Sequence, residues 1–228
     1  MQNSTFRAGL RDSLPVFIGY FSASIAFGLL ARNGGLSLLE AQSFSLICYT
    51  GAAQFMALNL IAAGASGFQV IISFALLNLR YTLMSAAVAK KVSFKSFAQR
   101  LMLAFGVTDE NFAITTSQPG RVSPAYQAAV EFGPWLGWNG GTLFGWMFGS
   151  ILPEALSTAM VSSLYALFTA LLLPELKKGR PWIITAGAAA LFNTILELWT
   201  NLGSGWSFVI AMLAGTAVGM FVIPEDQA

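Results

Sequence analysis

The sequence predicts an all-α membrane protein, and three observations lead to that fold class. Of its 228 residues, 56% are hydrophobic and only 10% are charged, with a mean hydropathy of +0.67. An ordinary soluble domain carries about 25% charged residues. The apolar residues fall in blocks close to the ~20 residues that cross a hydrocarbon core. The blocks show no sustained period-2 alternation, and an open sheet edge cannot be satisfied in lipid, so we expect a polytopic transmembrane helical bundle.

We expect one transmembrane domain with six to eight membrane segments. It starts with a short amphipathic helix on the membrane surface, capped by Ser4 or Thr5. The expected parts are this lead-in over 1–13, three segments over 14–89, a basic cytoplasmic loop over 90–100, three segments over 101–174, a second basic loop over 175–181 and two segments over 182–223. The apolar runs themselves cover 14–31, 43–63, 68–89, 101–116, 128–152, 155–173, 182–198 and 206–223.

The positions of the basic residues leave two alternatives for how these runs cross the membrane. Lys and Arg of short loops prefer the cytoplasmic side, and here they cluster at 7–11, 90–100 and 177–180. Three runs separate each cluster from the next, although an odd number of full crossings cannot return to the same side. Either one run in each set of three fails to cross completely, or the two sets form an inverted repeat in which one loop breaks the charge rule.

Two runs contain residues that weaken a helix at membrane depth. The second run holds Tyr49, Gly51 and Gln54 within residues 49–55, and the fifth holds Gly, Pro and Asn within residues 133–141. Irregular backbone at that depth is tolerated only where it is buried in protein or lines a cavity. We therefore predict at least one discontinuous helix, interrupted in the second or the fifth run.

A charged residue in the third run marks the candidate binding site. Arg80, close to Asn78, lies about midway along that run, where a charge costs about 2.5–3.5 kcal/mol on insertion scales. We expect Arg80 to face the interior and to lie within reach of Asp109 or Glu110 of the fourth run. Adjacent residues point about 100° apart on a helix, so both acids face inward only if the helix is unwound there; otherwise one is a cap or a solvated charge.

Other residues in the runs leave their roles open. Glu131 and Glu197 fit either an interior or an interfacial position. Glycines four residues apart let two helices approach closely, and this spacing occurs twice in succession in the fifth run, at Gly141, Gly145 and Gly149.

The composition also excludes several kinds of chemistry. With no His and only Cys48, the chain has no imidazole base, no His/Cys metal cluster and no internal disulfide, so no metal or cofactor is expected. It contains no G-x-S-x-G motif, and we do not expect an intramembrane enzyme. A net charge of +2 is too small for a nucleic-acid partner.

Six short motifs run in order along nearly the whole chain. They are 7–15 (RAGLRDSLP), Phe27-Gly28, Tyr49-x-Gly51-Ala52-x-Gln54-Phe55, Asn78-Leu79-Arg80, Thr108-Asp109-Glu110 and Trp138-x-x-Gly141-Thr142. With them the sequence resembles the AzlC-type permeases, the large subunits of bacterial branched-chain amino acid exporters. Tyr81 stands where that family commonly has His, so a proton-carrying role for an imidazole is not carried over.

The resemblance implies a multi-pass protein of the bacterial inner membrane. It implies export of valine, leucine, isoleucine and sometimes methionine, together with a small hydrophobic subunit of the AzlD type. We interpret the chain as a secondary transporter coupled to protons or to the membrane potential. It has no G-x-x-x-x-G-K-[ST] motif, so ATP coupling would need another chain.

An amino acid zwitterion needs a cation for its carboxylate, an anion for its ammonium and an apolar pocket. Arg80 can supply the cation, Asp109 the anion, and an unwound helix near Gly51 can add backbone N–H groups. The predicted substrate-binding residues are Tyr49, Gly51, Gln54, Asn78, Arg80, Asp109 and Glu110. The alternative is a structural or accessory membrane subunit in which Arg80 and Asp109 form a fixed bridge.

Overall fold

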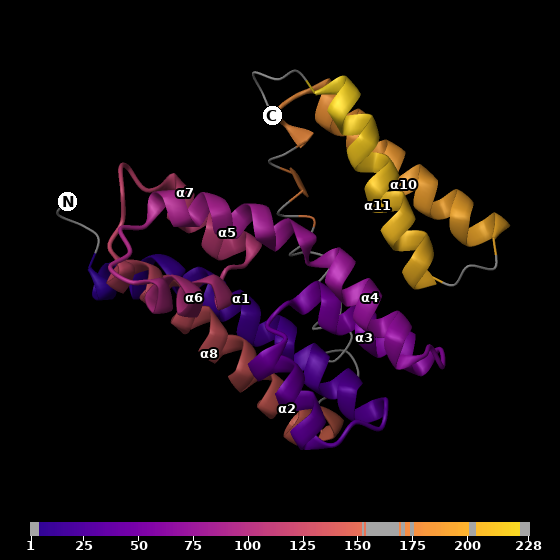
Figure 1. Cartoon of the computed structure of the whole chain (residues 1–228). Coiled ribbons are helices and arrows are strands. Elements are labelled where there is room, and N and C mark those ends of the chain that lie inside the picture. Colours follow the sequence, from indigo (N-terminus) through magenta and orange to yellow (C-terminus); the bar gives the residue numbers. More distant parts are fainter. Residues whose placement is uncertain are drawn as a thin grey trace. The chain divides into compact units, whose positions relative to one another are not determined.

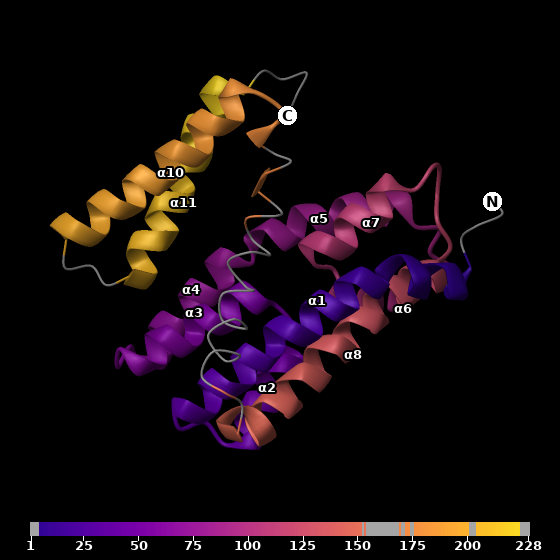
Figure 2. The same cartoon turned by 180° about the vertical axis from the view of Figure 1, so that it is seen from behind.

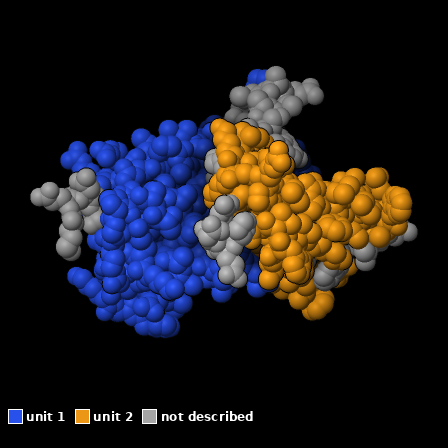
Figure 3. Space-filling view, turned by 90° about the horizontal axis from the view of Figure 1, so that it is seen from above, with its two compact units in different colours: residues 1–58, 78–163 blue, residues 59–77, 164–228 orange. Residues whose placement is uncertain are grey.

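The computed structural model describes residues 5–151, 153, 169, 172–173, 176–200 and 204–223. Within these residues the regular elements are all helices, with one isolated β-bridge between Val92 and Val122. The predicted all-α fold class is confirmed. The chain divides into unit 1, residues 1–58 with 78–163, and unit 2, residues 59–77 with 164–228 (Figure 3). The sixth apolar run, 155–173, lies almost entirely outside the described residues.

The helices are labelled in Figure 1. Unit 1 holds α1 (Phe6–Asn33), α2 (Leu38–Ile47), most of α3 (Gly51–Ala62), α5 (Leu79–Lys91), α6 (Phe97–Phe105), α7 (Asp109–Ser117), α8 (Pro124–Phe148) and the 3-10 turn η1 (Gly149–Ile151). Unit 2 holds the end of α3, α4 (Gly67–Leu77), α10 (Arg180–Trp199) and α11 (Ser204–Val222). In the described residues, the stretches long and apolar enough to cross a membrane are Phe6–Asn33, Gly67–Lys91 and Arg180–Trp199. The total of six to eight segments stays a prediction.

Helix α1 joins the expected lead-in to the first apolar run. Of the two predicted caps, Ser4 and Thr5, the cap is Thr5, whose hydroxyl accepts the N–H of Ala8 at 3.2 Å. The expected lead-in over 1–13 and the first apolar run form one helix, because α1 continues through Pro15 without a break. The position of the lead-in on the membrane surface stays a prediction. Contacts with α8 along the early turns explain the continuity: a Cβ on Gly9 would lie 2.5 Å from the carbonyl oxygen of Tyr126.

The backbones of α1 and α8 touch along their length, and the two helices run side by side in Figures 1 and 2. A Cβ on Gly141 would lie 2.3 Å from the carbonyl oxygen of Phe21, and one on Gly145 would lie 2.1 Å from that of Ile25. Gly28 of α1 faces Thr142 of α8 in the same way, at 2.2 Å. The close approach predicted from the glycine spacing is confirmed.

The predicted interruption falls in the second run and not in the fifth. Helix α2 ends at Ile47 and α3 starts at Gly51, so the break lies at residues 48–50. Helix α8 runs unbroken through residues 133–141 with Pro134 inside it. The fifth-run candidate was wrong because its glycines serve close packing: a Cβ on Gly137 would lie 2.7 Å from the carbonyl oxygen of Phe17.

Two further breaks divide the third and fourth runs. Asn78 separates α4 from α5, and residues 106–108 separate α6 from α7. Neither break was specifically predicted, although an unwound fourth run was the stated condition for two inward-facing acids. In unit 2, α10 and α11 pack against each other, with Gly215 placed so that a Cβ would lie 2.5 Å from the Cβ of Ala189.

Candidate functional site

In unit 1, the three helix breaks that precede α3, α5 and α7 lie close together. The hydroxyl of Thr50 donates to Oδ1 of Asn78 at 3.0 Å, which joins the first break to the second. The guanidinium of Arg80 lies 3.0 Å from the carboxylate of Asp109, which joins the second break to the third. The hydroxyl of Tyr81 also lies 3.4 Å from that of Thr50. Three helix N-termini, with their unpaired N–H groups and positive dipole ends, therefore come together.

The pairing of Arg80 with Asp109 confirms the sequence prediction. Their side chains remain 37% and 22% exposed, so the pair is reachable and not sealed in a core. Arg80 also lies 3.4 Å from the hydroxyl of Tyr81 through Nη2. Its Nε is buried and has no hydrogen-bond partner among the described residues, so the guanidinium keeps a donor for a ligand.

Both acids of the third break face inward, because the helix starts just before them. Thr108 caps α7 by accepting the N–H of Asn111 at 3.3 Å, which places Asp109 and Glu110 in the first turn. The carboxylate of Glu110 accepts a hydrogen bond from the hydroxyl of Tyr20 in α1. Carboxylates in the first helical turn are stabilised by the N–H groups and the helix dipole. Glu110 is thus neither a cap nor a solvated charge.

The first break is braced by α8. Gln54, fully buried, donates from Nε2 to the carbonyl oxygen of Phe44 at 3.0 Å and accepts at Oε1 from the indole of Trp138, also at 3.0 Å. Gly51 lies so close to that indole that a Cβ would sit 2.6 Å from it. Both ends of the Gln54 amide are therefore used inside the protein. The substrate-binding roles proposed for Gln54 and Gly51 stay predictions.

Aromatic rings form a wall beside Glu110, which follows Asp109 in the first turn of α7. Tyr49, 6% exposed, meets the ring of Tyr20 edge-on at 6.1 Å between centroids and stacks on Phe105 at 6.4 Å. Tyr20 in turn meets Trp138 edge-on at 5.4 Å. Ionic groups beside an aromatic wall are what a zwitterion with an apolar side chain requires.

Sequence reasoning missed two features of the site region. Tyr20 and Trp138 were not assigned to it, because an aromatic residue in an apolar run resembles ordinary packing. The sequence does not distinguish an interior from an interfacial position for Glu131, but it is only 5% exposed, and Nε2 of Gln127 donates to it at 2.6 Å. The signal available was the i, i+4 spacing of Gln127 and Glu131, which places two polar side chains on one helical face.

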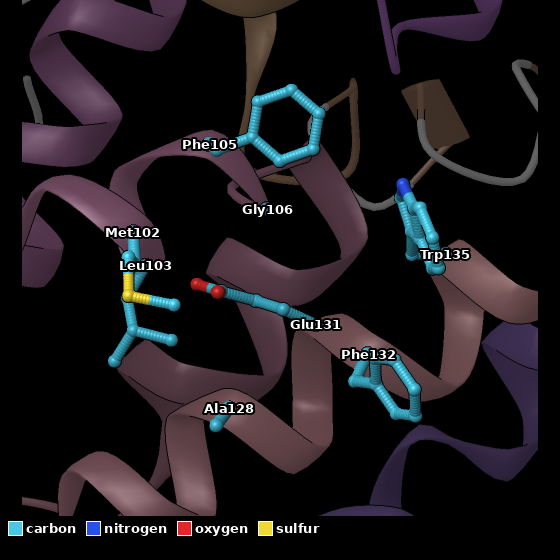
Figure 4. A pocket seen from close by; sticks show the side chains of 8 residues that line it. All are labelled: Met102, Leu103, Phe105, Gly106, Ala128, Glu131, Phe132 and Trp135. Atoms are coloured by element: carbon cyan, nitrogen blue, oxygen red, sulfur yellow. The ribbon is translucent and has the colours of Figure 1, made fainter. Parts of the chain in front are cut away.

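A pocket of about 290 Å³ opens in front of the Glu131 carboxylate (Figure 4). Apart from Glu131, the side chains that line it are aliphatic or aromatic. The indole N–H of Trp135 is buried and has no hydrogen-bond partner among the described residues. Lining residues are Met102, Leu103, Phe105, Gly106, Ala128, Glu131, Phe132 and Trp135. In the described residues, no group of three or more Asp, Glu, Cys or His could hold a metal ion.

These observations define an all-α membrane protein whose polar residues gather at helix breaks. The chain belongs to the AzlC family: the family described as AzlC protein matches residues 15–152. It is 36% identical to an uncharacterised membrane protein of Archaeoglobus fulgidus, covering 94% of each chain. It is 32% identical to the inner membrane protein YgaZ of Escherichia coli, over 95% of this chain and 89% of that one.

A more distant relative carries a functional name. The branched-chain amino acid transport protein AzlC of Bacillus subtilis is 24% identical over 72% of this chain and 67% of its own length. No solved structure matches the chain. The family is therefore linked to transport, and membrane location agrees with the names of these relatives.

Proposed function

We propose that this chain is a secondary transporter that exports valine, leucine, isoleucine and methionine across a bacterial inner membrane. The observation that carries the proposal is the partly exposed Arg80–Asp109 pair at the junction of three helix breaks. Discontinuous helices with N-termini directed at an anionic substrate group are a recurring device of secondary transporters. The name of the Bacillus subtilis relative supports the substrate class.

The substrate exchanges partners with the protein ion pair. Its carboxylate binds the Arg80 guanidinium and the N–H groups at the start of α3, while its ammonium binds Asp109 and Glu110. Each charge of the Arg80–Asp109 pair thus finds an opposite charge on the substrate. In the empty site the two side chains neutralise each other, which avoids an unpaired charge at membrane depth.

Specificity for branched side chains comes from the aromatic wall. Tyr49 and Tyr20 present apolar faces beside Glu110, whereas a third charge on the substrate would meet no partner there. We therefore expect neutral apolar amino acids to be exported and lysine or glutamate to be rejected. Coupling to protons or to the membrane potential supplies the driving force.

A small hydrophobic subunit of the AzlD type works with the chain in this proposal. Large apolar side chains of α6 remain exposed in the described structure, among them Leu101 at 64% and Met102 at 75%. A partner helix or lipid covers such a surface in a membrane. Co-purification of a tagged copy of this chain with the small subunit tests the association.

The test is counterflow of labelled valine in proteoliposomes that contain the purified chain, with and without the small subunit. We expect internal unlabelled valine or leucine to drive uptake of labelled valine, and internal lysine to have no effect. An absence of counterflow under both conditions would contradict transport and favour the accessory-subunit alternative, with Arg80 and Asp109 as a fixed bridge.

A further inference from the structure

A chain of buried polar side chains joins α7 to α8 behind the ion pair. Nε2 of Gln127 donates to the carboxylate of Glu131 at 2.6 Å, and Oε1 of Gln127 accepts from the hydroxyl of Thr115 at 2.7 Å. The same hydroxyl lies 2.8 Å from the carbonyl oxygen of Asn111. Asn111, Thr115 and Gln127 have no exposed surface, and Glu131 has 5%. Water therefore does not reach Asn111, Thr115 or Gln127.

The Thr115 hydroxyl has one hydrogen and two acceptors within reach, so this chain has two complete arrangements. When Glu131 is ionised, it accepts from the Gln127 amide, and Thr115 donates to Oε1 of Gln127. When Glu131 is protonated, its O–H can donate to Oε1 of Gln127 once that amide turns over. Nε2 of Gln127 then donates to Thr115, whose hydrogen moves to the carbonyl oxygen of Asn111. The Glu131 carboxyl, the Gln127 amide and the Thr115 hydroxyl each keep a partner in both arrangements.

The two arrangements differ in α7, the helix that carries Asp109 and Glu110. A Thr hydroxyl that donates to the carbonyl four residues earlier bends a helix. For Thr115 that carbonyl belongs to Asn111, which is two residues after Asp109. The side-chain amide of Asn111 also donates to the carbonyl oxygen of Gly106 at 2.9 Å, across the break. Glu131 packs against that break: a Cβ on Gly106 would lie 2.6 Å from the Cβ of Glu131.

We propose that Glu131 is a proton-binding site and that the Gln127–Thr115–Asn111 chain transmits its protonation state to the start of α7. This inference rests on the proposed transport function for its role and names the residue that couples transport to protons. On protonation the carboxylate takes a proton from hydronium and leaves water; on release the reverse occurs. The ligand is thus a proton, and Asp109 and Glu110 remain with the amino acid.

The surroundings of Glu131 suit a proton and no fixed cation. In the described part of the chain, Lys and Arg form no ion pair with it. The elements around it carry these titratable groups: Tyr49 before α3, Asp109 and Glu110 of α7, Arg100 of α6, Tyr126 of α8, and Arg7, Arg11, Asp12, Tyr20 and Arg32 of α1. Glu110 is bonded to Tyr20, and the guanidinium of Arg100 lies 5.6 Å from the ring of Phe94. The pocket of Figure 4 gives the carboxylate room to exchange its proton.

The first experiment measures proton binding without transport. Infrared difference spectra of the purified full chain in lipid, between acid and alkaline pH, report the carbonyl stretch of a buried protonated acid. We expect this band in the wild type, in Thr115→Val and in the control Glu197→Gln, whose carboxylate is exposed on α10. We expect it to be missing in Glu131→Gln. A band that persists in Glu131→Gln would overturn the proposal.

The second experiment measures coupling in proteoliposomes that enclose a pH-sensitive dye. We expect valine to drive proton movement in the wild type and in Glu197→Gln. Glu131→Gln and Thr115→Val should lose that movement, and their valine flux should no longer respond to pH. Valine-driven proton movement that survives in Glu131→Gln, or wild-type valine transport without proton movement, would overturn the inference.

The outcomes also separate this inference from the proposed function. A wild type that shows the infrared band but no valine counterflow contradicts the transport proposal and supports the proton site. If Glu131→Gln does not accumulate in the membrane, Glu131→Asp replaces it. The shorter side chain should shift the pH at which the band disappears, and an unchanged pH would count against Glu131.

Discussion

The two units of this chain use their helices in opposite ways. Unit 1 buries polar side chains against one another, as in the 2.7 Å contact between the hydroxyls of Ser45 and Thr142. In unit 2, α10 has no buried residue, and large apolar side chains such as Leu191 and Leu198 are 61% and 75% exposed. The polar helices therefore need specific partners inside the chain, whereas the apolar helix needs only lipid or another apolar surface.

The contrast locates where substitutions will have consequences. Polar contacts at membrane depth are specific in distance and partner, because an unpaired group is costly in hydrocarbon. Apolar contacts with lipid tolerate many side chains. We expect changes at polar or closely packed positions of unit 1 to impair transport or folding, and matched changes in unit 2 to impair neither.

The largest expected effect is at the ion pair. Arg80→Lys keeps the charge but loses the planar fork that binds a carboxylate bidentately, and Asp109→Asn removes the ammonium partner. We expect each to lower valine counterflow by about 100-fold, as the loss of a charge-assisted hydrogen bond worth up to ~3 kcal/mol implies. Membrane yield should remain near that of the wild type.

A double substitution distinguishes the site from a fixed bridge. In Arg80→Met with Asp109→Leu, both charges are gone, and replacing a buried pair by apolar residues is often neutral or stabilising. We expect this protein to accumulate in the membrane and to transport no valine. Normal valine flux per folded molecule would mean that neither residue binds substrate.

A matched pair of glycines tests the packing difference. In Gly145→Ala the new Cβ would lie 2.1 Å from the backbone oxygen of Ile25, whereas in Gly187→Ala of α10 nothing lies within 4 Å. We expect the first change to lower the free energy of unfolding by about 1–3 kcal/mol, from overpacking. The second should raise it by up to ~1 kcal/mol, because Ala favours the helix.

Thermal unfolding in detergent provides the measurement for both glycine variants. Equal midpoints would show that α1 and α8 are not in backbone contact in the membrane protein.

A smaller effect is expected where α8 braces the first break. Trp138→Phe removes the indole donor and leaves Oε1 of Gln54 without its partner. We expect a loss of about 0.6–2 kcal/mol in unfolding free energy, as interhelical hydrogen bonds in membranes give. Trp199→Phe, at a position 84% exposed, is the control and should cause no change.

The smallest effect concerns the start of α2. The Glu40 carboxylate accepts from the hydroxyl and the N–H of Ser37, and these bonds lower its pKa. Because the folded pKa lies below the unfolded one, the cap contributes fully above the unfolded pKa and is lost as pH falls through the folded pKa. We expect amide exchange at Ser37 and Glu40 to accelerate relative to α8 in that acidic window. A pH-independent ratio would contradict this.

The energetic cost of a charge in lipid made the Arg80–Asp109 pair predictable from sequence. A guanidinium in the middle of an apolar run must find an anion, and the fourth run offered two. The break before Gly51 was predictable for a related reason, because polar and helix-weakening residues coincide there. The cost of an unsatisfied group is a property of the residue itself and needs no knowledge of the neighbours.

Other features depended on neighbours that the sequence does not reveal. Gly and Pro in the fifth run suggested a break, but Gly137 and Gly141 face the backbone of α1 and the helix continues. The sequence alone does not distinguish a glycine that ends a helix from one that lets a second helix pack closely. Glu131 was ambiguous for the same reason, since only the position of α6 and α7 shows that it is buried.

The break in the second apolar run also limits how this run can be inserted into the membrane during synthesis. Helices α2 and α3 have 10 and 12 residues, about 15 and 18 Å, so neither alone crosses a ~30 Å hydrocarbon core. The hydrogen-bond partners of their polar side chains are synthesised much later. Gln42 bonds to Asn139, 97 residues further along the chain, and Gln54 bonds to Trp138, 84 residues further along. Helices α2 and α3 therefore remain at the water interface or bound to a chaperone until α8 has been synthesised.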